Sequence, residues 1–533
     1  MVSYLTGHGT KVTPQSEPIP GSDQVPNSAG GFAFQIGDFD RLRRFLILGT
    51  EGGTYYTKQR QLTSENADTV RRCLAVDGPL TVDTIVKISS EGRAPKNDPA
   101  LFALAVAASE GDDQTRRLAL EALSAVARTG THLFQFVGFI EEFRGWGRGV
   151  RRAVGEWYGR PDAAYQAIKY RQRGGWSHRD VLRLAHPRPV DERQSALFGW
   201  IVGLEEAKEA ATANEIEIQA YEAAQLSASP KDTATLVRLY GSKLPREALS
   251  TDHLTDPDVW AAMLEVGMPL TAMIRNLATM TRVGTLTPMG DMTKVVVDVL
   301  RNDEALRRAR VHPIAVLAAL ATYRSGFSTR GETSWTPVTE IVDALDGAFY
   351  RAFGNVEPTG KRVMLALDVS SSMTWDGIAG VPGLTPRVGS AAMALVTLAT
   401  ETRTIVTGFT SGTQGIASLN ISPRQRLDDV VDYIGGLGFG GTDCSLPMLY
   451  ATERGLEIDS FVVYTDNETW AGRIHPSQAL REYRSKTGIP AKLIVVGMTA
   501  TGFSIADPRD PGMLDVVGFD TATPGLISEI TRS

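Results

Sequence analysis

The sequence has only two cysteines among its 533 residues, Cys73 and Cys444, and they lie far apart in the chain. So few cysteines exclude a disulfide framework and a zinc ribbon with thiolate ligands, and they suit a reducing cytoplasm. The seven histidines form no HExxH pair or comparable ligand spacing, which excludes the zinc enzymes that depend on such a pair.

Long hydrophobic runs are also missing. The longest, such as LFALAVAA at 101–108, are much shorter than the roughly 20 apolar residues that a membrane helix needs. The opening residues MVSYLTGHGT lack a basic segment followed by an apolar one, so the sequence gives no sign of secretion. We therefore expect a cytoplasmic protein with no membrane partner.

What remains is an ordinary globular composition, with 42% hydrophobic and 22% charged residues. A chain of 533 residues is too long for one hydrophobic core, so we expect two or three domains. The net charge of −6 argues only weakly against nucleic acid as a partner, because the distribution of charge matters more than its sum.

The first two thirds of the chain contain a short region without hydrophobic periodicity, followed by a long region with helical periodicity. Residues 1–30 include a Pro-, Ser- and Gly-rich stretch without hydrophobic periodicity, which predicts a flexible or draped arm. Residues 31–356 carry apolar residues at helical spacing in many short segments, and such helices bury their stripes best in a stacked array of helical hairpins. One stripe, in the segment 269–282, combines Leu270, Met273, Ile274, Leu277 and Met280.

The pattern changes after FGNVEPTGK (353–361), which we interpret as a linker. In residues 357–533 the short β-runs RVMLALD, TRTIVTGFT, SFVVYTD and AKLIVVGM alternate with helical stretches. This alternation predicts an α/β domain with a doubly wound, Rossmann-like parallel sheet, whose ligands bind at the carboxyl ends of the strands. The predicted fold is thus multidomain, an all-α helical-repeat domain followed by an α/β domain.

Oxygen-bearing side chains gather at the predicted ends of two of these strands. Asp368, Ser370 and Ser372 alternate after the first strand, Thr442 lies in a glycine-rich loop, and Asp466 follows SFVVYT. Two carboxylates and three hydroxyls form an all-oxygen site for a small hard cation, and magnesium fits it best. The alternative is that Asp368 caps the following turn and the serines satisfy loop amides. A dinucleotide site is disfavoured because the turn lacks GxGxxG.

Positive charge is concentrated between Phe143 and Arg188, where eleven Arg and Lys face three Asp and Glu. Such a segment suits phosphate neutralisation, with aromatic rings that stack on unpaired bases. The alternative is a solvated basic face that pairs with acidic neighbours such as the helix-prone segment 204–224. No groove-reading motif indicates a double-stranded DNA reader. The interleaved aromatic residues are Trp146, Trp157, Tyr158, Tyr165, Tyr170 and Trp176.

Local spacing predicts how this segment presents its charge. Lys169 and Arg173 are four residues apart, which places them on one face of a helix that Gly174 and Gly175 would end with a left-handed cap.

A second predicted helix follows directly. Ser177 and Asp180 have the spacing of a capping box at its start, and Arg179, Arg183 and His186 form one of its stripes. The two helices would thus project Lys169, Arg173, Arg179, Arg183 and His186 into solvent, where they could neutralise phosphates. Arg144, Arg148, Arg151 and Arg152 are weaker candidates for the same role.

The α/β region with its oxygen cluster resembles a von Willebrand factor A domain with a metal-ion-dependent adhesion site (MIDAS). Together with the helical region, it resembles the TROVE-domain Ro autoantigen family and its bacterial orthologues. The segments that carry this resemblance are RFLILGTEGGTYY (44–56), KYRQRGGWSHRDVLRLAHP (169–187), MPLTAMIRNLATMT (268–281), ALDGAFYRAFGNVEPTGKRVMLALDVSSSM (344–373), GGTDCSLPM (440–448) and YTDNETWAGRIHPSQALREYRSKTGIPAKLIVVGMT (464–499).

The resemblance implies a ring of HEAT-like repeats closed by the A domain. Its outer surface would bind small noncoding Y RNA through Lys169, Arg173 and His186, and its hole would accept single-stranded 3′ ends of misfolded RNA. Polynucleotide phosphorylase, a degradative exonuclease, is an implied partner tethered through Y RNA. The implied ligands of Mg²⁺ are the five residues of the oxygen cluster, with an acidic group of a partner at the open coordination position. The loop 374–386 and the N-terminal arm depart from the family pattern, so the ligand preference of the metal site is open.

We therefore expect a noncatalytic, monomeric RNA-binding protein that acts in RNA quality control or stress recovery. The alternative is a magnesium-dependent protein–protein adhesion scaffold, in which the basic helices would be incidental. A ribonuclease would need a general base beside a nucleophile or a two-metal carboxylate cluster, and the sequence offers neither convincingly.

Overall fold

The computed structural model describes residues 12–49, 59–94, 96–309, 311, 313–328, 333–352, 358–374, 384–411, 415–437, 440–498, 502–517 and 523–532. The chain divides into two compact units, and each is described by itself. The helical unit spans Ala67–Gly354, and the α/β unit combines Met1–Asn66 with Asn355–Ser533.

The helical unit contains a long series of short helices and one small hairpin. Its helices are α2 (Gln59–Glu91, which starts before the unit), α3 (Asp98–Glu110), α4 (Asp113–Glu121), α5 (Leu123–Val126), α6 (Gly130–Phe143), α7 (Arg148–Trp157), α8 (Ala163–Lys169), α9 (His178–Ala185), α10 (Glu192–Val202), α11 (Glu205–Asn214), α12 (Ile216–Gln225), α13 (Pro230–Tyr240), α14 (Pro257–Glu265), α15 (Leu270–Arg282), α16 (Asp291–Leu300), α17 (Asp303–Arg308), α18 (Pro313–Ser325) and α19 (Thr339–Ala352). Single 3₁₀ turns are η1 (Gly241–Lys243), η2 (Arg246–Ala248) and η3 (His253–Thr255), and the hairpin strands are β3 (Gln172–Arg173) and β4 (Trp176–Ser177).

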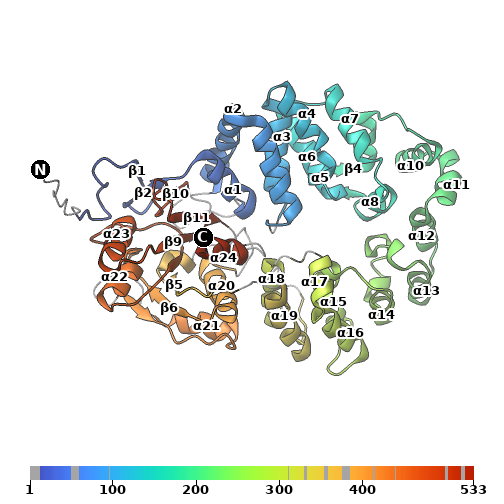
Figure 1. Cartoon of the computed structure of the whole chain (residues 1–533). Helices are drawn as coiled ribbons and strands as arrows, with labels where there is room; N and C mark the ends of the chain where they lie inside the picture. The colour runs from blue at the N-terminus through green and yellow to red at the C-terminus, as the bar shows by residue number, and fades with distance from the viewer. Residues whose placement is uncertain are drawn as a thin grey trace, which may run out of the picture. The chain divides into compact units, whose positions relative to one another are not determined.

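The helices pack mainly on their neighbours in the sequence. Helix α3 packs on α4 and α6, α10 on α11, α13 on α14, and α18 on α19, and Figure 1 shows them following one another along an arc. The stripe predicted on α15 is confirmed, because all five of its apolar residues are buried. A row of helices that contact mainly their neighbours is the stacked helical array that the short, broken periodicity predicts.

The α/β unit contains the predicted doubly wound sheet. Its strands and helices are β1 (Gln24–Pro26), β2 (Phe32–Gln35), α1 (Asp38–Leu48), β5 (Val363–Asp368), η4 (Ser371–Thr374), α20 (Pro386–Thr400), β6 (Thr404–Phe409), β7 (Ile416–Ser418), α21 (Leu427–Gly435), α22 (Leu446–Glu453), β8 (Ser460–Thr465), α23 (Pro476–Thr487), β9 (Lys492–Gly497), β10 (Phe503–Ser504), β11 (Met513–Val517) and α24 (Thr523–Arg532).

The main sheet has the strand order β11-β9-β8-β5-β6-β7, and every pairing is parallel except that of β7 with β6. Strand β5 is central, and all six of its residues are buried. Helices α22 and α23 join the strands in one hydrophobic cluster, while α20 contacts β5 and α24 contacts β9 and β11. Because β5 and β8 are parallel neighbours, their carboxyl ends lie side by side at one edge of the sheet.

The N-terminal segment corrects the predicted domain boundaries. Residues 1–30 were expected to form a flexible or draped arm, and 31–356 the helical domain. Instead, β1 and β2 join β10 in a three-stranded antiparallel sheet, and Gln15 is fully buried. Helix α1 is fixed to the same unit, since the buried Arg44 donates to Asp515 and to the carbonyl of Phe503. The described part of this segment, from residue 12 on, thus belongs with the α/β unit.

Helix α2 consists of two helical parts joined at a kink. It is broken at Asp77, whose φ of −156° and ψ of 94° are not helical, and Pro79 follows two residues later. The Asp77 carboxylate accepts from the N–H of Leu80 at 2.8 Å, so Asp77 caps the start of the second part of the helix.

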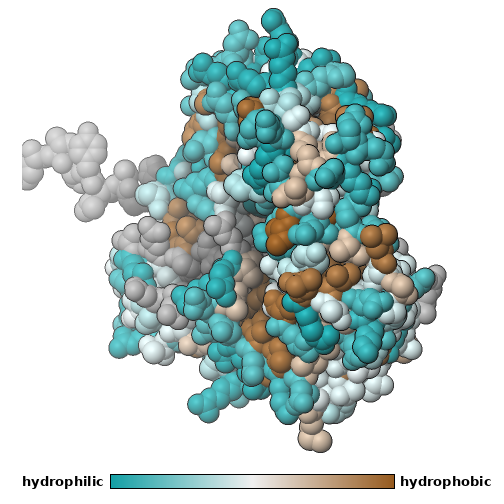
Figure 2. Space-filling model, turned by 90° about the vertical axis from the view of Figure 1, so that its right-hand side faces the viewer, coloured by the Kyte–Doolittle hydropathy of each residue, from teal (hydrophilic) through white to brown (hydrophobic). Residues whose placement is uncertain are grey.

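In the upper part of Figure 2 the visible surface is mostly hydrophilic, as expected when each helix buries its one apolar stripe. Hydrophobic residues reach this part of the surface in small patches (Figure 2). Among the described residues, no helix combines the length and the apolar character needed to cross a membrane.

Candidate functional site

The oxygen cluster lies at the carboxyl end of β5, as predicted. Asp368 is the last residue of that strand and is only 1% exposed. One carboxylate oxygen accepts from the backbone N–H of Ser370 at 2.9 Å, and the other from the hydroxyl of Thr465 at 2.8 Å. Since Thr465 ends the neighbouring strand β8, these bonds join the two strand ends.

The remaining predicted ligands converge on the same edge. The hydroxyls of Ser370 and Ser372 are 3.0 Å apart, and the Ser372 side chain forms a hydrogen bond with Asp466. Thr442 is 2% exposed, and its carbonyl accepts from the N–H groups of Trp470 and Ala471 at 3.1 Å each. The structure thus joins four of the five residues directly and ties the loop of Thr442 to the segment after Asp466.

Burial makes this cluster electrostatically costly without a cation. It raises the pKa of Asp368 to about 7, to which the nearby Asp466 carboxylate adds, and it also raises the pKa of Asp466. Two adjacent buried carboxylates disfavour ionisation, and a divalent cation would reverse that effect. Among the described residues there is no group of three or more His, Cys, Asp or Glu that could hold a metal. The oxygen cluster offers two carboxylates and three hydroxyls, and oxygen donors of this kind are the ligands that hard cations take.

One residue of this region was missed by sequence reasoning. The Gln15 side chain donates to Asp443 at 2.8 Å and to the carbonyl of Ile474 at 2.9 Å, while the hydroxyl of Thr469 donates to its oxygen. Asp443 and Thr469 flank the loops that carry Thr442 and Asp466. No local signal marks Gln15, since its partners lie more than 400 residues away in the chain.

The basic segment differs from the predicted helix pair at its first helix. Helix α8 ends at Lys169, so Arg173 does not share its face but lies on β3, in a hairpin with β4. Gly174 and Gly175 form the turn of that hairpin, with φ of 57° and 83°. Both glycines adopt the left-handed backbone that was predicted, but in a β-turn rather than at a helix end.

The second helix agrees better with the prediction. Ser177 and Asp180 form the predicted capping box at the start of α9. Arg183 and His186 are exposed, and His186 ends the helix in the left-handed region with φ of 45°. Arg179 is also exposed, but its guanidinium donates to the carbonyl of Val202, at the C-terminus of α10, at 3.0 and 2.6 Å.

Lys169 is half-buried, not fully exposed. Its ammonium lies 5.3 Å from the ring centre of Tyr165 and 5.6 Å from that of Tyr170. Burial lowers the pKa of Lys169, and the positive charges of Arg275 and Arg246 lower it further, while Glu247 raises it. We call the side chains of Lys169, Arg173, Arg183 and His186 the basic surface. Arg246 and Arg275 extend it near Lys169, and the local charge count missed them because they lie in distant parts of the sequence.

The acidic segment 204–224 interacts with only part of the basic segment. Burial raises the pKa of Glu222, but hydrogen bonds from Lys208 and Trp200 and the charges of Lys208 and Arg171 lower it. The acidic segment forms two helices, α11 and α12, separated at Glu215 by non-helical backbone. The ion pairs of this segment join Glu215 to Arg193, Glu217 to Lys243 and Glu222 to Lys208. Within the described ranges, Lys169, Arg173 and Arg183 form no ion pair with an acidic residue, so their charge is available to a ligand.

Two of the interleaved aromatic residues belong to the core. Trp157 is fully buried and Tyr158 is 2% exposed. Their polar atoms are satisfied internally, because the indole donates to the Ala127 carbonyl and the phenol bonds to His178. They cannot stack on RNA. The other four, Trp146, Tyr165, Tyr170 and Trp176, are partly exposed.

The weaker candidates lie at the surface. Arg148, Arg151 and Arg152 are exposed on α7. Arg152 pairs with Glu156 at 3.5 Å, and Arg144 follows the end of α6.

Comparisons with known proteins cover both units. The TROVE domain family model matches residues 25–244 and 242–322, and the Ro60 vWA domain model matches residues 362–531. The chain is 42% identical to the RNA-binding protein RO60 of Deinococcus radiodurans, over 97% of each chain. It is 36% identical to the RNA-binding protein RO60 of Caenorhabditis elegans, over 99% of this chain and 93% of that one. The crystal structure of the Deinococcus radiodurans RO (RSR) protein superimposes with a TM-score of 0.70 at 41% identity, covering 93% of this chain and 99% of the other.

Proposed function

Because the chain belongs to the TROVE-domain Ro60 family, we propose that it is an RNA-binding protein, as its relatives are named, and that it performs no catalysis. In finer detail, the RNA is a small structured noncoding RNA similar to Y RNA, held on the surface around Lys169, Arg173, Arg183 and His186. Single-stranded 3′ ends of misfolded RNA occupy the hole of the ring that the family resemblance implies. Quality control of RNA is the corresponding cellular role, with polynucleotide phosphorylase as a partner through the bound RNA.

The observation that carries this proposal is the unneutralised charge of the basic surface. Other cations of the helical unit, such as Arg193 and Lys243, are paired with carboxylates. Lys169 and Arg173 have no such partner within 4.0 Å among the described residues. Near Lys169, Arg246 and Arg275 add two positive charges against one carboxylate, Glu247, which pairs with Arg246 at 3.6 Å. Uncompensated cations of this kind bind phosphates and release counterions.

The test is RNA affinity as a function of salt, with the full chain and the Lys169→Ala/Arg173→Ala variant. For about six phosphate contacts, affinity should fall roughly a thousandfold between about 50 and 200 mM salt. The variant should bind more weakly and with a shallower slope, by about 1 for each lost contact. Lys294→Ala/Arg351→Ala removes the same charge from α16 and α19, where both side chains are ion-paired, and should keep the slope. Equal slopes for all three proteins would refute the proposal.

A second proposed function uses the oxygen cluster. We propose that Asp368, Ser370, Ser372, Thr442 and Asp466 hold Mg²⁺, and that the bound ion takes an acidic group of a protein partner. The support is the buried, all-oxygen donor set at the carboxyl end of the central strand. The cation would supply charge neutralisation and an open coordination position, while these residues orient it. This proposed Mg²⁺ site is compatible with RNA binding in the helical unit.

A further inference from the structure

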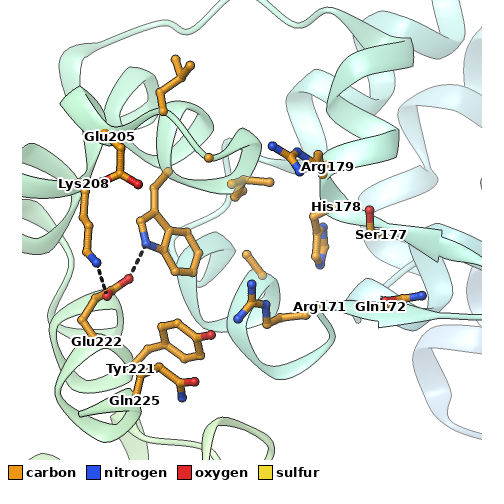
Figure 3. A pocket seen from close by; sticks show the side chains of 15 residues that line it. Arg171, Gln172, Ser177, His178, Arg179, Glu205, Lys208, Tyr221, Glu222 and Gln225 are labelled. Atoms are coloured by element: carbon orange, nitrogen blue, oxygen red, sulfur yellow. Dashed lines mark hydrogen bonds and ion pairs between the residues drawn. The ribbon is translucent and has the colours of Figure 1, made fainter.

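A cavity of about 450 Å³ lies in the helical unit beside the basic surface. Figure 3 shows Lys208, Tyr221 and Glu222 on one side and Arg171 and Arg179 on the other. The first three come from α11 and α12, and the last two from the β3–β4 hairpin region and α9. Its volume falls within the roughly 300–1,000 Å³ of small-ligand pockets, which is ample for a nucleobase with its ribose.

The lining offers flat surfaces for a planar ring. The guanidinium of Arg171 lies 4.9 Å from the ring centre of Tyr221. The ring of Trp200 meets Tyr221 edge to face, with centres 5.6 Å apart and an angle of 83°. Arg171 is exposed and Trp200 is partly exposed, so both can contact a ligand. Aromatic rings and guanidinium planes are the groups on which unpaired bases stack.

The polar groups of the cavity are already fixed by the protein. Glu222 accepts from the Trp200 indole at 3.0 Å and from Lys208 at 2.8 Å, as the dashed lines in Figure 3 mark. Arg179 is held by the Val202 carbonyl, and Gln225 donates to the Ala248 carbonyl at 2.8 Å. A ligand therefore meets a preformed site and loses little affinity to ordering these side chains.

Charge and location favour a base that belongs to a polynucleotide. Three cations, Arg171, Arg179 and Lys208, line the cavity against two carboxylates, Glu205 and Glu222, which leaves one net positive charge. Gln172 lines the cavity and directly precedes Arg173 on β3. Because successive side chains of a strand alternate between its faces, Arg173 lies on the opposite face of the hairpin from Gln172. The link to the basic segment is made by Arg171 and Arg179, which belong to that segment and line the cavity.

We propose that this cavity receives one unpaired nucleobase of the RNA that binds to the neighbouring basic surface. Arg171 and Trp200 would contact the faces of the base, while Tyr221, which is only 8% exposed, supports both of them from behind. Glu222, Lys208 and Gln225 would contact its polar edge. The inference rests on the proposed RNA-binding function, and it adds a base-contacting site to a surface that otherwise contacts phosphates.

The experiment compares a hairpin RNA carrying a single-stranded uridine tail with the same RNA carrying an abasic tail. The full chain should bind the base-bearing RNA about tenfold more tightly or better, as expected for one stacked base. Trp200→Leu should remove most of this difference and keep the salt slope. The matched control Arg173→Gln, next to the cavity, should weaken both RNAs equally, make the slope shallower and keep the difference.

Separate results overturn the two proposals. If neither RNA binds in a salt-dependent way, the RNA-binding function fails. If both bind but Trp200→Leu keeps the full difference, the base lies elsewhere and only the cavity proposal fails. Uridine monophosphate that binds as tightly as the tailed RNA would make the cavity a free-nucleotide site, which also overturns the proposal.

Two further measurements guard against a variant that does not fold. Arg171→Gln changes an exposed side chain and should reduce the same difference. In the unsubstituted chain, a photoreactive 4-thiouridine tail should crosslink to the peptide that contains Trp200 or Tyr221. Crosslinks confined to other peptides contradict the proposal.

Discussion

Under the proposed function, Lys169 is the side chain whose surroundings best suit a bound phosphate. Its ammonium lies against two tyrosine rings, and partial burial lowers its pKa. The rings restrict the side chain, so less conformational freedom is lost when a phosphate binds. Because the site is partly shielded from water, a contact with an anion is stronger there than at an exposed lysine.

His178 carries a pH prediction at the same scale. Burial lowers its pKa from 6.5 to about 4, so protons bind to the unfolded chain more readily than to the folded one between these values. The neutral, buried His178 therefore lowers the free energy of unfolding only when the pH is acidic. The folded state has its full stability above about pH 6.5 and loses up to about 3 kcal/mol as the pH falls toward 4. Thermal unfolding of the helical unit, followed by circular dichroism, should show Tm falling over this range.

The control for this prediction is His178→Gln. Its helical unit should be less stable at neutral pH, because the contact with Tyr158 changes, but its Tm should fall less between pH 6.5 and 4. A smaller fall of Tm should remain in this variant, because burial also lowers the pKa of His132 to about 4. An unchanged pH dependence would contradict the assignment to His178.

At the scale of elements, the N-terminal segment is a structural part of the α/β unit. Strand β2 pairs with β10 from the far end of the chain, and Gln15 connects the loops on either side of the oxygen cluster. Segments that are rich in Pro, Ser and Gly are expected to be disordered only if they bury little. Here a few buried positions suffice to fix the segment.

Gln15→Ala should therefore lower the free energy of unfolding of the α/β unit by about 1–3 kcal/mol, because buried polar groups lose their partners. The matched control is Glu17→Ala, since Glu17 is exposed in the same segment and only its backbone carbonyl accepts a bond from His475. That variant should change stability by less than about 0.5 kcal/mol. Denaturant unfolding in which both variants match the unsubstituted chain would speak against a structural role of Gln15.

At the scale of the whole molecule, the chain separates two kinds of chemistry into two units. The cations proposed to bind phosphate lie in the helical unit, and the oxygen cluster lies in the α/β unit. Each unit has its own core, so a ligand of one unit is expected to stabilise that unit.

Magnesium provides the corresponding prediction. Adding Mg²⁺ at about 100 times its Kd should stabilise the α/β unit by about 2.7 kcal/mol, and EDTA should reverse the effect. Asp466→Asn should abolish the response in differential scanning calorimetry. Asp459→Asn changes a carboxylate that pairs with Arg362 just before β8 begins, and should lower Tm but keep the response. A response that survives in Asp466→Asn would remove this residue from the site.

The sequence by itself determined the fold class, the four main parallel strands and the helical stripes, because hydrophobic periodicity is local. It also determined the place of the oxygen cluster, since parallel strands bring Asp368 and Thr465 to one sheet edge. Only the tertiary structure decided that Trp157 is core, that Arg173 lies on a hairpin, and that Gln15 belongs to the α/β unit. These facts depend on contacts between residues far apart in the chain, or on competition between a helix and a turn, which local spacing does not resolve.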